Sequence, residues 1–342
     1  MPQSSSFSNA ADITAIERRG ESSCSPAPHL ACKDMGAIGA DESAVRQEQT
    51  GQHLVSFLIP VQNEALYVRE ALNSVLGQTW RNIEVIVIDD HSDDETYSIV
   101  DEMRRSDTRL QLHRSSGRGK VHAFNMAWNL SRGDIIALFA GDDILPESSV
   151  QRRVELLAQH GCQVASGKVR SFSTNPKYDG ILYPRGDRPN LSGGAAAFTR
   201  QFATTVFPIP DELPNEDVWT RLHIECFSDM VVWTDEIVSH YRIHEANSMA
   251  FGAPFEVKAR VVHVRCRAYL LFLEKYRHLL PRKSVAQIKA ILEMDRMRKA
   301  GDFFGILLLP NLGIKQKLAG ISYSNRFFYR IRVIFERYLA GA

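Results

Sequence analysis

The chain has 342 residues, 44% of them hydrophobic, which is enough for one or two domains with sizeable cores. Its formal net charge is +1, so the overall charge gives no indication of nucleic-acid binding. The five cysteines are scattered without CxxC spacing, which argues against a disulfide framework or a zinc site and favours a reducing, cytoplasmic compartment. No apolar run approaches the ~20 residues that cross a bilayer, so we expect a soluble protein or one attached peripherally to the inner face of a membrane.

Charge and composition divide the chain into three parts. Residues 1–50 lack sustained periodicity and are predicted to form a flexible tail. Residues 51–250 form the predicted catalytic domain, with a first half to residue 150 and a second half beyond it. Residues 251–342 are predicted to be helical and carry 18 Lys and Arg against 6 Asp and Glu.

Strands and helices alternate through the first half of this domain. Short β-branched runs at residues 54–60, 83–90, 109–113 and 135–140 predict strands, the first ended by Pro60. Helices are predicted between them, one capped by Asn63 and one begun by a capping box at residues 92–95. This alternation is typical of an α/β fold with a mostly parallel sheet flanked by helices.

Two of the predicted strands end in paired acids, Asp89/Asp90 and Asp142/Asp143. Acids are common near helix N-termini, so either pair alone has that simpler explanation. Parallel strands, however, bring their carboxyl ends to one edge of the sheet, where open α/β sheets bind ligands. Two acidic pairs at that edge therefore predict a nucleotide site with a divalent cation, Mg²⁺ or Mn²⁺.

Four segments in order carry a family resemblance: VSFLIPVQNE from residue 55, SVLGQT from 74, VIVIDDHS from 85 and GDD from 141. They resemble the successive motifs of family 2 glycosyltransferases, which are inverting enzymes of the GT-A fold. The resemblance implies a nucleotide-sugar donor, a UDP-sugar above others, and a divalent cation. It also implies that Pro60 and Glu64 border the nucleotide, Asp90 contacts the base, Asp142 lies near the ribose and Asp143 holds the metal.

A basic loop at residues 114–120 precedes a predicted helix. Arg118 and Lys120 are expected to reach the donor's phosphates or sugar, although a solvated turn would look the same in sequence.

Later segments extend the resemblance to about residue 250. Gly193 and Gly194 resemble the loop that approaches the sugars, where the lack of a side chain permits close contact. Asp217, supported by Glu216, matches the motif whose aspartate is the catalytic base, and ordinary helix capping is the alternative. Arg242 and His244 are predicted to touch the diphosphate or the metal, although a lone histidine more often caps or packs.

Together these features predict a metal-dependent inverting glycosyltransferase that acts on a hydroxyl of a glycan, lipid-linked or other acceptor in polysaccharide or glycoconjugate biosynthesis. Residues 325–337 mix aromatics with arginines like an interfacial helix, which predicts contact with anionic membranes. Nucleic acid is not an expected partner. Two alternatives remain. The first is a nucleotidyltransferase, although the sequence lacks the phosphate loop that such enzymes usually have after the first strand. The second is a non-catalytic nucleotide-sugar-binding protein on the same fold.

Overall fold

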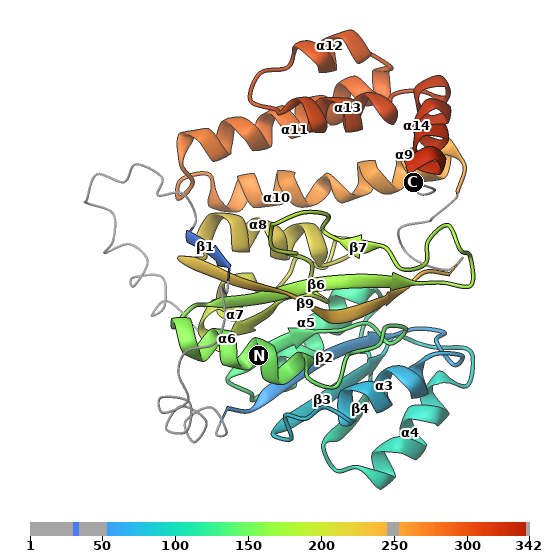
Figure 1. Ribbon diagram of the computed structural model, residues 1–342, viewed down its shortest axis with the longest axis vertical. Coiled ribbons are helices and arrows are strands. Elements are labelled where there is room, and N and C mark those ends of the chain that lie inside the picture. The colour runs from blue at the N-terminus through green and yellow to red at the C-terminus, as the bar shows by residue number, and fades with distance from the viewer. Residues whose placement is uncertain (1–29, 34–52, 245–252, 340–342) are drawn as a thin grey trace, which may run out of the picture.

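The structure is a computed structural model that describes residues 30–33, 53–244 and 253–339, and side-chain surroundings within 53–244 and 253–334. A central sheet is covered by helices on both faces, and a group of C-terminal helices stands on one side of it (Figure 1). Across the described ranges, none of the helices combines the length and apolarity that crossing a bilayer requires.

The elements fall into strands, the helices between them and the C-terminal helices. The strands are β1 (Leu30–Lys33), β2 (Val55–Val61), β3 (Ile83–Asp89), β4 (Leu110–Arg114), β5 (Ile135–Leu138), β6 (Val164–Phe172), β7 (Leu182–Tyr183), β8 (Ala197–Thr199) and β9 (Met230–Arg242). The interleaved helices are α3 (Val68–Leu76), α4 (Thr96–Ser106), α5 (Lys120–Leu130), α6 (Ser149–His160), α7 (Arg200–Val206) and α8 (Asp217–Phe227). The C-terminal helices are α9 (Phe255–Arg265), α10 (Arg267–Tyr276), α11 (Arg282–Ala300), α12 (Phe303–Leu308), α13 (Ile314–Ser322) and α14 (Arg326–Leu339).

The sheet has the order β1-β9-β6-β8-β5-β2-β3-β4, and β7 pairs with β6. Strands β4, β3, β2 and β5 are parallel, as the sequence predicts, and β8 is antiparallel to both β5 and β6. The mostly parallel α/β architecture with a helical C-terminal region is therefore confirmed.

Strand β2 shows why these runs are buried on both faces. Phe57 and Ile59 point into a core with α3, α4 and α6, whereas Leu58 points into a second core with α5, α7 and α8. Side chains alternate across a strand, so a continuous apolar run suits a strand covered on both sides.

Several local predictions are wrong, each because a long-range contact prevailed. Leu30–Lys33 is not part of a flexible tail but pairs in parallel with β9, while the rest of residues 1–50 lies outside the described residues. Pro60 does not end its strand; it lies inside β2, beyond the last residue of β2 that pairs with β5.

Two predicted helix caps are also wrong. Asn63 does not cap α3; it adopts a left-handed φ of 54° and its side chain accepts a hydrogen bond from Asp93 N. Ser92 does not cap α4 but accepts from Asn63 N. The two loops after β2 and β3 therefore brace each other instead of capping their own helices.

The C-terminal helices share a core with the domain. Trp219 and His223 of α8 pack against Phe272 and Tyr276 of α10. His223 is fully buried, with Nδ1 2.9 Å from the Trp219 carbonyl and Nε2 3.3 Å from the Tyr276 hydroxyl. Burial lowers the pKa of His223 to about 3, because the charged imidazolium is poorly solvated there.

Because of His223, we expect the free energy of unfolding to decrease in acid. The unfolded chain protonates His223 near pH 6.5 and the folded chain only near its pKa of about 3, so stability falls as pH drops between these values. The proton that His223 binds on unfolding lowers the free energy of unfolding by at most about 1.4 kcal/mol for each pH unit. Chemical denaturation of wild type and His223→Phe should show a smaller loss in the variant over this range. Equal slopes for His223→Phe and the exposed control His278→Phe would contradict the prediction.

Candidate active site

The paired acids do meet at one edge of the sheet. Val55 of β2 lies opposite Ile83 of β3 and Ile135 of β5 in the same parallel register. The carboxyl ends of β3 and β5 therefore flank that of β2, and the acids that follow them lie at the same edge. This confirms the predicted placement.

The turn with Asp142 and Asp143 is held by Arg242 at the end of β9. The backbone N–H of Arg242 donates to Asp143 Oδ1 at 2.8 Å, and its Nε donates to the Asp142 carbonyl at 2.7 Å. The same guanidinium pairs with Glu70 at 2.6 Å and lies 4.5 Å from the centre of the Tyr67 ring. Arg242, predicted to touch the diphosphate, thus positions the acidic turn here.

His244 lies beside Asp142 rather than Asp143. Its Nε2 is 2.9 Å from Asp142 Oδ2, and its ring centre is 4.9 Å from that of Tyr67. To ligate a cation through this nitrogen, His244 would have to give up its contact with Asp142. The rest of the predicted segment, residues 245–248, lies outside the described residues.

Buried negative charge gathers behind this turn. Burial, followed by the nearby Asp142 carboxylate, raises the pKa of Glu64 well above its ordinary value, and the same two causes raise the pKa of Asp143. Glu64 Oε2 is inaccessible to solvent and has no hydrogen-bond partner among the described residues. An ion of opposite charge would relieve this repulsion.

Lys120, the first residue of α5, adds a second cation to this site besides Arg242. Its Nζ lies 3.5 Å from Glu216 Oε2. Burial alone would lower the pKa of Lys120, but the carboxylates of Glu216, Asp142 and Glu64 outweigh burial and raise it. The acids around the site, Glu64, Asp142, Asp143 and Glu216, therefore outnumber the cations Lys120 and Arg242.

The donor set suits a hard cation in part. Carboxylate oxygens are what Mg²⁺ and Mn²⁺ prefer, and Mg²⁺ usually takes one or two of them together with substrate phosphates. Among the described residues, no three His, Cys, Asp or Glu side chains converge closely enough to enclose an ion. A cation here would therefore complete its coordination with phosphate oxygens.

Gly141 leaves the space that Glu64 occupies. A Cβ at this position would lie 2.1 Å from Glu64 Oε2 and 2.6 Å from Val61 Cγ1. We expect Gly141→Ala to lower the free energy of unfolding by about 1–3 kcal/mol through overpacking. Urea denaturation measures this, with Gly194→Ala as control because a Cβ there meets nothing within 4 Å. Equal stability of the two variants would mean that the turn can shift to accommodate the Cβ without loss of stability.

The loop predicted to bind phosphate is tied to the acid predicted to contact the base. Asp90 is buried, and its Oδ2 accepts a hydrogen bond of 2.8 Å from the Gly119 N–H. Gly119 has a φ of 100°, a conformation that favours glycine, and Lys120 follows it. Arg118 is exposed on the same loop, and it lines neither the cavity beside the acidic turn nor the groove next to the C-terminal helices. Pro60 lies within β2 near this edge.

A cavity of about 310 Å³ opens beside the acidic turn. It brings together six of the residues predicted from sequence, namely Lys120, Asp143, Gly193, Gly194, Glu216 and Asp217. The predicted residues Pro60, Glu64, Asp90, Arg118, Asp142, Arg242 and His244 do not line it. The cavity thus joins the first half of the domain, through Asp143, to the second half, through Asp217.

Asp217 begins α8 and is paired with a residue that the sequence did not suggest. Its Oδ2 forms an ion pair with Arg265 of α9, and its Oδ1 accepts a hydrogen bond of 2.7 Å from Val218 N. Each carboxylate oxygen has a second lone pair, so Asp217 can still accept a proton. Arg265 lines the cavity, and its only signal in the sequence is the general basic character of residues 251–342. The C-terminal helices therefore complete this site.

Comparison with known proteins identifies the domain. Residues 56–206 match the sequence model of the family described as Glycosyl transferase family 2. The chain carries a family 2 glycosyltransferase domain. This agrees with the resemblance seen in the four motifs and with the paired acids at the sheet edge.

Curated relatives of the glycosyltransferase domain are similar over part of their length. Glycosyltransferase GlyG of Streptococcus pneumoniae serotype 4 is 29% identical over 131 residues, which cover 38% of this chain and 42% of that protein. The uncharacterized glycosyltransferase RP339 of Rickettsia prowazekii is 36% identical over 104 residues, covering 30% of this chain and 32% of the relative. In both cases the matched region is less than two thirds of the relative.

Solved structures share the fold of the glycosyltransferase domain and its helical extension. Residues 1–349 of S. aureus TarS superpose with a TM-score of 0.55 at 16% identity, covering 85% of this chain and 92% of that one. The same protein in complex with UDP-GlcNAc gives a TM-score of 0.52 at 18% identity, covering 81% and 80%. Identity this low shows the GT-A fold and nothing further.

Proposed function

We propose that this protein is a metal-dependent inverting glycosyltransferase that transfers a sugar from a nucleotide-sugar donor, with UDP-sugars favoured, to an acceptor hydroxyl. The observation that carries the proposal is that Asp143 and Asp217 line one cavity together with Gly193 and Gly194. A cation-binding acid and a proton-accepting acid on the walls of one space are what a single displacement needs.

In the proposed mechanism Asp217 is the base. It takes the proton of the acceptor hydroxyl as the oxygen attacks the anomeric carbon from the face opposite the diphosphate. Arg265 holds the Asp217 carboxylate in place through their ion pair. Lys120 lines the same cavity, where its ammonium can neutralise charge on the departing diphosphate.

Other residues would shape the donor site. Gly193 and Gly194 let the sugar approach the backbone, with Glu216 between Lys120 and Asp217 supporting both. Asp90 and Pro60 would border the nucleotide, and Asp90 acts further by holding the loop with Arg118 and Lys120.

The divalent cation, Mn²⁺ or Mg²⁺, would be held by Asp143, with Asp142 orienting the nucleotide and Glu64 adding negative charge behind them. When bound, such an ion neutralises charge that grows on the diphosphate leaving group. His244 would reach the ion only by leaving Asp142, so we assign it first the role of orienting that carboxylate.

Thermal unfolding of the protein in a panel of nucleotide sugars, with and without Mn²⁺, tests this proposal. A ligand present at 100 times its dissociation constant should stabilise the fold by about 2.7 kcal/mol. Stabilisation by at least one UDP- or GDP-sugar that depends on the metal is the expected result. If no nucleotide sugar of the panel raises the unfolding temperature, this cavity is not a donor site.

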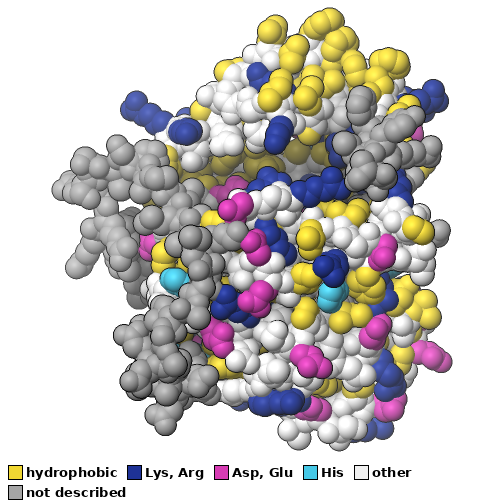
Figure 2. Space-filling model, viewed as in Figure 1, with side chains coloured by type: hydrophobic (Ala, Val, Ile, Leu, Met, Phe, Trp, Pro, Cys, Tyr) yellow, Lys and Arg dark blue, Asp and Glu magenta, His cyan; other side chains and the backbone are white. Residues whose placement is uncertain are grey.

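A second proposal concerns membrane contact by the C-terminal helices. Exposed apolar side chains gather on α12 and α13, with Phe304 67%, Leu308 81% and Ile314 60% exposed, and Lys315 beside them. Figure 2 shows this patch at the upper end of the molecule. The surface predicted at residues 325–337 keeps Phe327, which is 66% exposed, but not Phe328, which packs on Phe303. Apolar side chains with basic neighbours suit an anionic bilayer surface.

We expect the protein to sediment with anionic vesicles, less at high salt, and Phe304→Ser/Leu308→Ser to abolish most of this binding. Each exposed apolar side chain contributes about 1.5–3 kcal/mol when fully buried in the interface. Leu66→Ser is the control. Leu66 is also highly exposed, at 85%, but it belongs to the first half of the domain and not to α12 or α13. Equal sedimentation of all three proteins would contradict the proposal.

A further inference from the structure

A large groove runs between the domain and the C-terminal helices and leads to Asp217. Its volume is about 1840 Å³, and its walls come from residues 175–192 on one side and from α9 and α14 on the other. Figure 2 shows a hollow between the C-terminal helices and the rest of the molecule, with Lys and Arg side chains along it. Asp217 and Arg265 line both this groove and the smaller cavity, so the two spaces meet at the proposed base.

The groove is strongly basic. Its described lining holds nine Lys and Arg side chains against three carboxylates. The carboxylates are already engaged, since Asp217 pairs with Arg265, Glu225 with Arg221 and Glu256 with Arg326. Among the lining residues that the structure describes, positive side chains therefore outnumber negative ones along a path that ends at the proposed base.

Three of these cations are open to a ligand. Arg185 and Arg188 on the loop after β7, and Arg330 on α14, are exposed, and the structure describes no carboxylate within ion-pair distance of any of them. They lie on the two walls of the groove. A groove lined by charges of one sign attracts ligands of the opposite sign.

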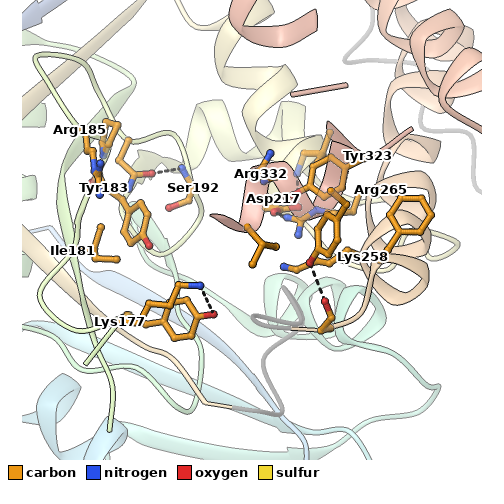
Figure 3. A pocket seen from close by; sticks show the side chains of 18 of the residues that line it. Lys177, Ile181, Tyr183, Arg185, Ser192, Asp217, Lys258, Arg265, Tyr323 and Arg332 are labelled. Carbon is orange, nitrogen blue, oxygen red and sulfur yellow. Dashed lines mark hydrogen bonds and ion pairs between the residues drawn. The ribbon is translucent and has the colours of Figure 1, made fainter. Parts of the chain in front are cut away.

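Tyrosines lie among the cations that line the groove. Figure 3 shows Lys177, Tyr183 and Arg185 on one side of Asp217, and Lys258 and Tyr323 on the other. Arg332 lies 4.7 Å from the centre of the Tyr323 ring. Aromatic rings offer flat apolar faces to sugar rings, and guanidinium groups bind carboxylate and phosphate in a bidentate manner.

We infer that this groove binds the acceptor, and that the acceptor is an anionic glycan chain that carries carboxylate or phosphate groups along its length. The inference rests on the proposed function, because it takes Asp217 as the base that the acceptor hydroxyl must reach. A chain suits the shape better than a membrane surface does, since a flat bilayer cannot enter a recess between two walls. Excess cations along the groove select against neutral chains of the same length.

The test measures binding of fluorescent probes by anisotropy at low and high salt. The probes are oligogalacturonate, which carries carboxylates, inorganic polyphosphate, which carries phosphates, and a neutral malto-oligosaccharide of matching length. We expect the full chain to bind one or both anions in a salt-sensitive way and the neutral probe weakly or not at all. The tighter of the two anions identifies the charged group of the acceptor.

The groove variant is Arg185→Gln/Arg188→Gln/Arg330→Gln, and its control is Arg282→Gln/Lys283→Gln/Lys289→Gln, three exposed cations of α11 outside the groove. Anion affinity should fall about tenfold or more in the groove variant and little in the control. Equal losses in the two variants, or equal binding of the neutral probe, would overturn the inference.

Nucleoside diphosphate binding, measured on the same proteins, separates this inference from the proposed function. Both variants should bind UDP or GDP with Mn²⁺ as wild type does, because the substituted residues do not line the smaller cavity. If wild type binds the nucleotide but neither anion, the acceptor inference is wrong and the donor site stands. If wild type binds an anion but no nucleotide, the proposed transferase function is wrong.

Discussion

Asp217→Asn should lower the rate of sugar transfer by about 10²–10⁴-fold while leaving donor binding nearly unchanged. The amide keeps the shape of the side chain and can still accept from Val218 N, but it is a far weaker base. A base acts on the acceptor and not on the nucleotide, so the loss should appear in turnover and not in donor affinity. This separates an enzyme from a non-catalytic nucleotide-sugar-binding protein.

Single-turnover transfer and calorimetric donor titration of wild type and variant measure the two effects. Asp229→Asn is the control, because Asp229 is an exposed acid at the far end of α8 from Asp217 and lines neither hollow. Full activity of Asp217→Asn would transfer the role of base to Glu216. Loss of donor binding in that variant would mean that Asp217 contacts the donor.

Asp143→Asn should abolish the metal-dependent part of nucleoside diphosphate binding. The amide carries no charge, and a site with one fewer carboxylate loses a ligand that Mn²⁺ and Mg²⁺ prefer. We expect affinity for UDP or GDP in the presence of Mn²⁺ to fall by at least about 100-fold, towards the value without metal. Calorimetric titration with and without Mn²⁺ decides this, and unchanged affinity would move the cation elsewhere.

The same variant should be more stable than wild type when no metal is present. Burial and Asp142 raise the pKa of Asp143 in the folded chain, so folding disfavours its ionised form. Its contribution to stability is complete below the unfolded pKa of about 3.9 and is lost as pH rises through the raised folded value. Asp143→Asn should therefore raise the metal-free unfolding temperature at pH 8 and not at pH 3.5. A lower unfolding temperature at pH 8 would show that the hydrogen bond from Arg242 N matters more than charge repulsion.

Taken by itself, the sequence determined the class of fold and singled out two acids that line one cavity. The run from Val55 to Val61 is apolar at every position but Ser56, and a run of this kind suits a strand buried on both faces whatever surrounds it. Asp143 and Asp217 stood out because they belong to short motifs that resemble those of family 2 glycosyltransferases. Information of this type lies within a few neighbouring residues, so it can be read locally.

Only the tertiary structure decided how these residues are used. Asn63 and Ser92 are residue types that often cap helices, yet they bond between two loops about 30 residues apart, because these loops follow the neighbouring strands β2 and β3. Arg265 reaches Asp217 from a helix 48 positions further on, and Arg242 clamps an acidic turn 100 positions earlier. The basic groove exists only because α9 and α14 fold back over residues 175–192. Contacts between such distant segments depend on packing of the whole chain, and no local pattern of residues specifies them.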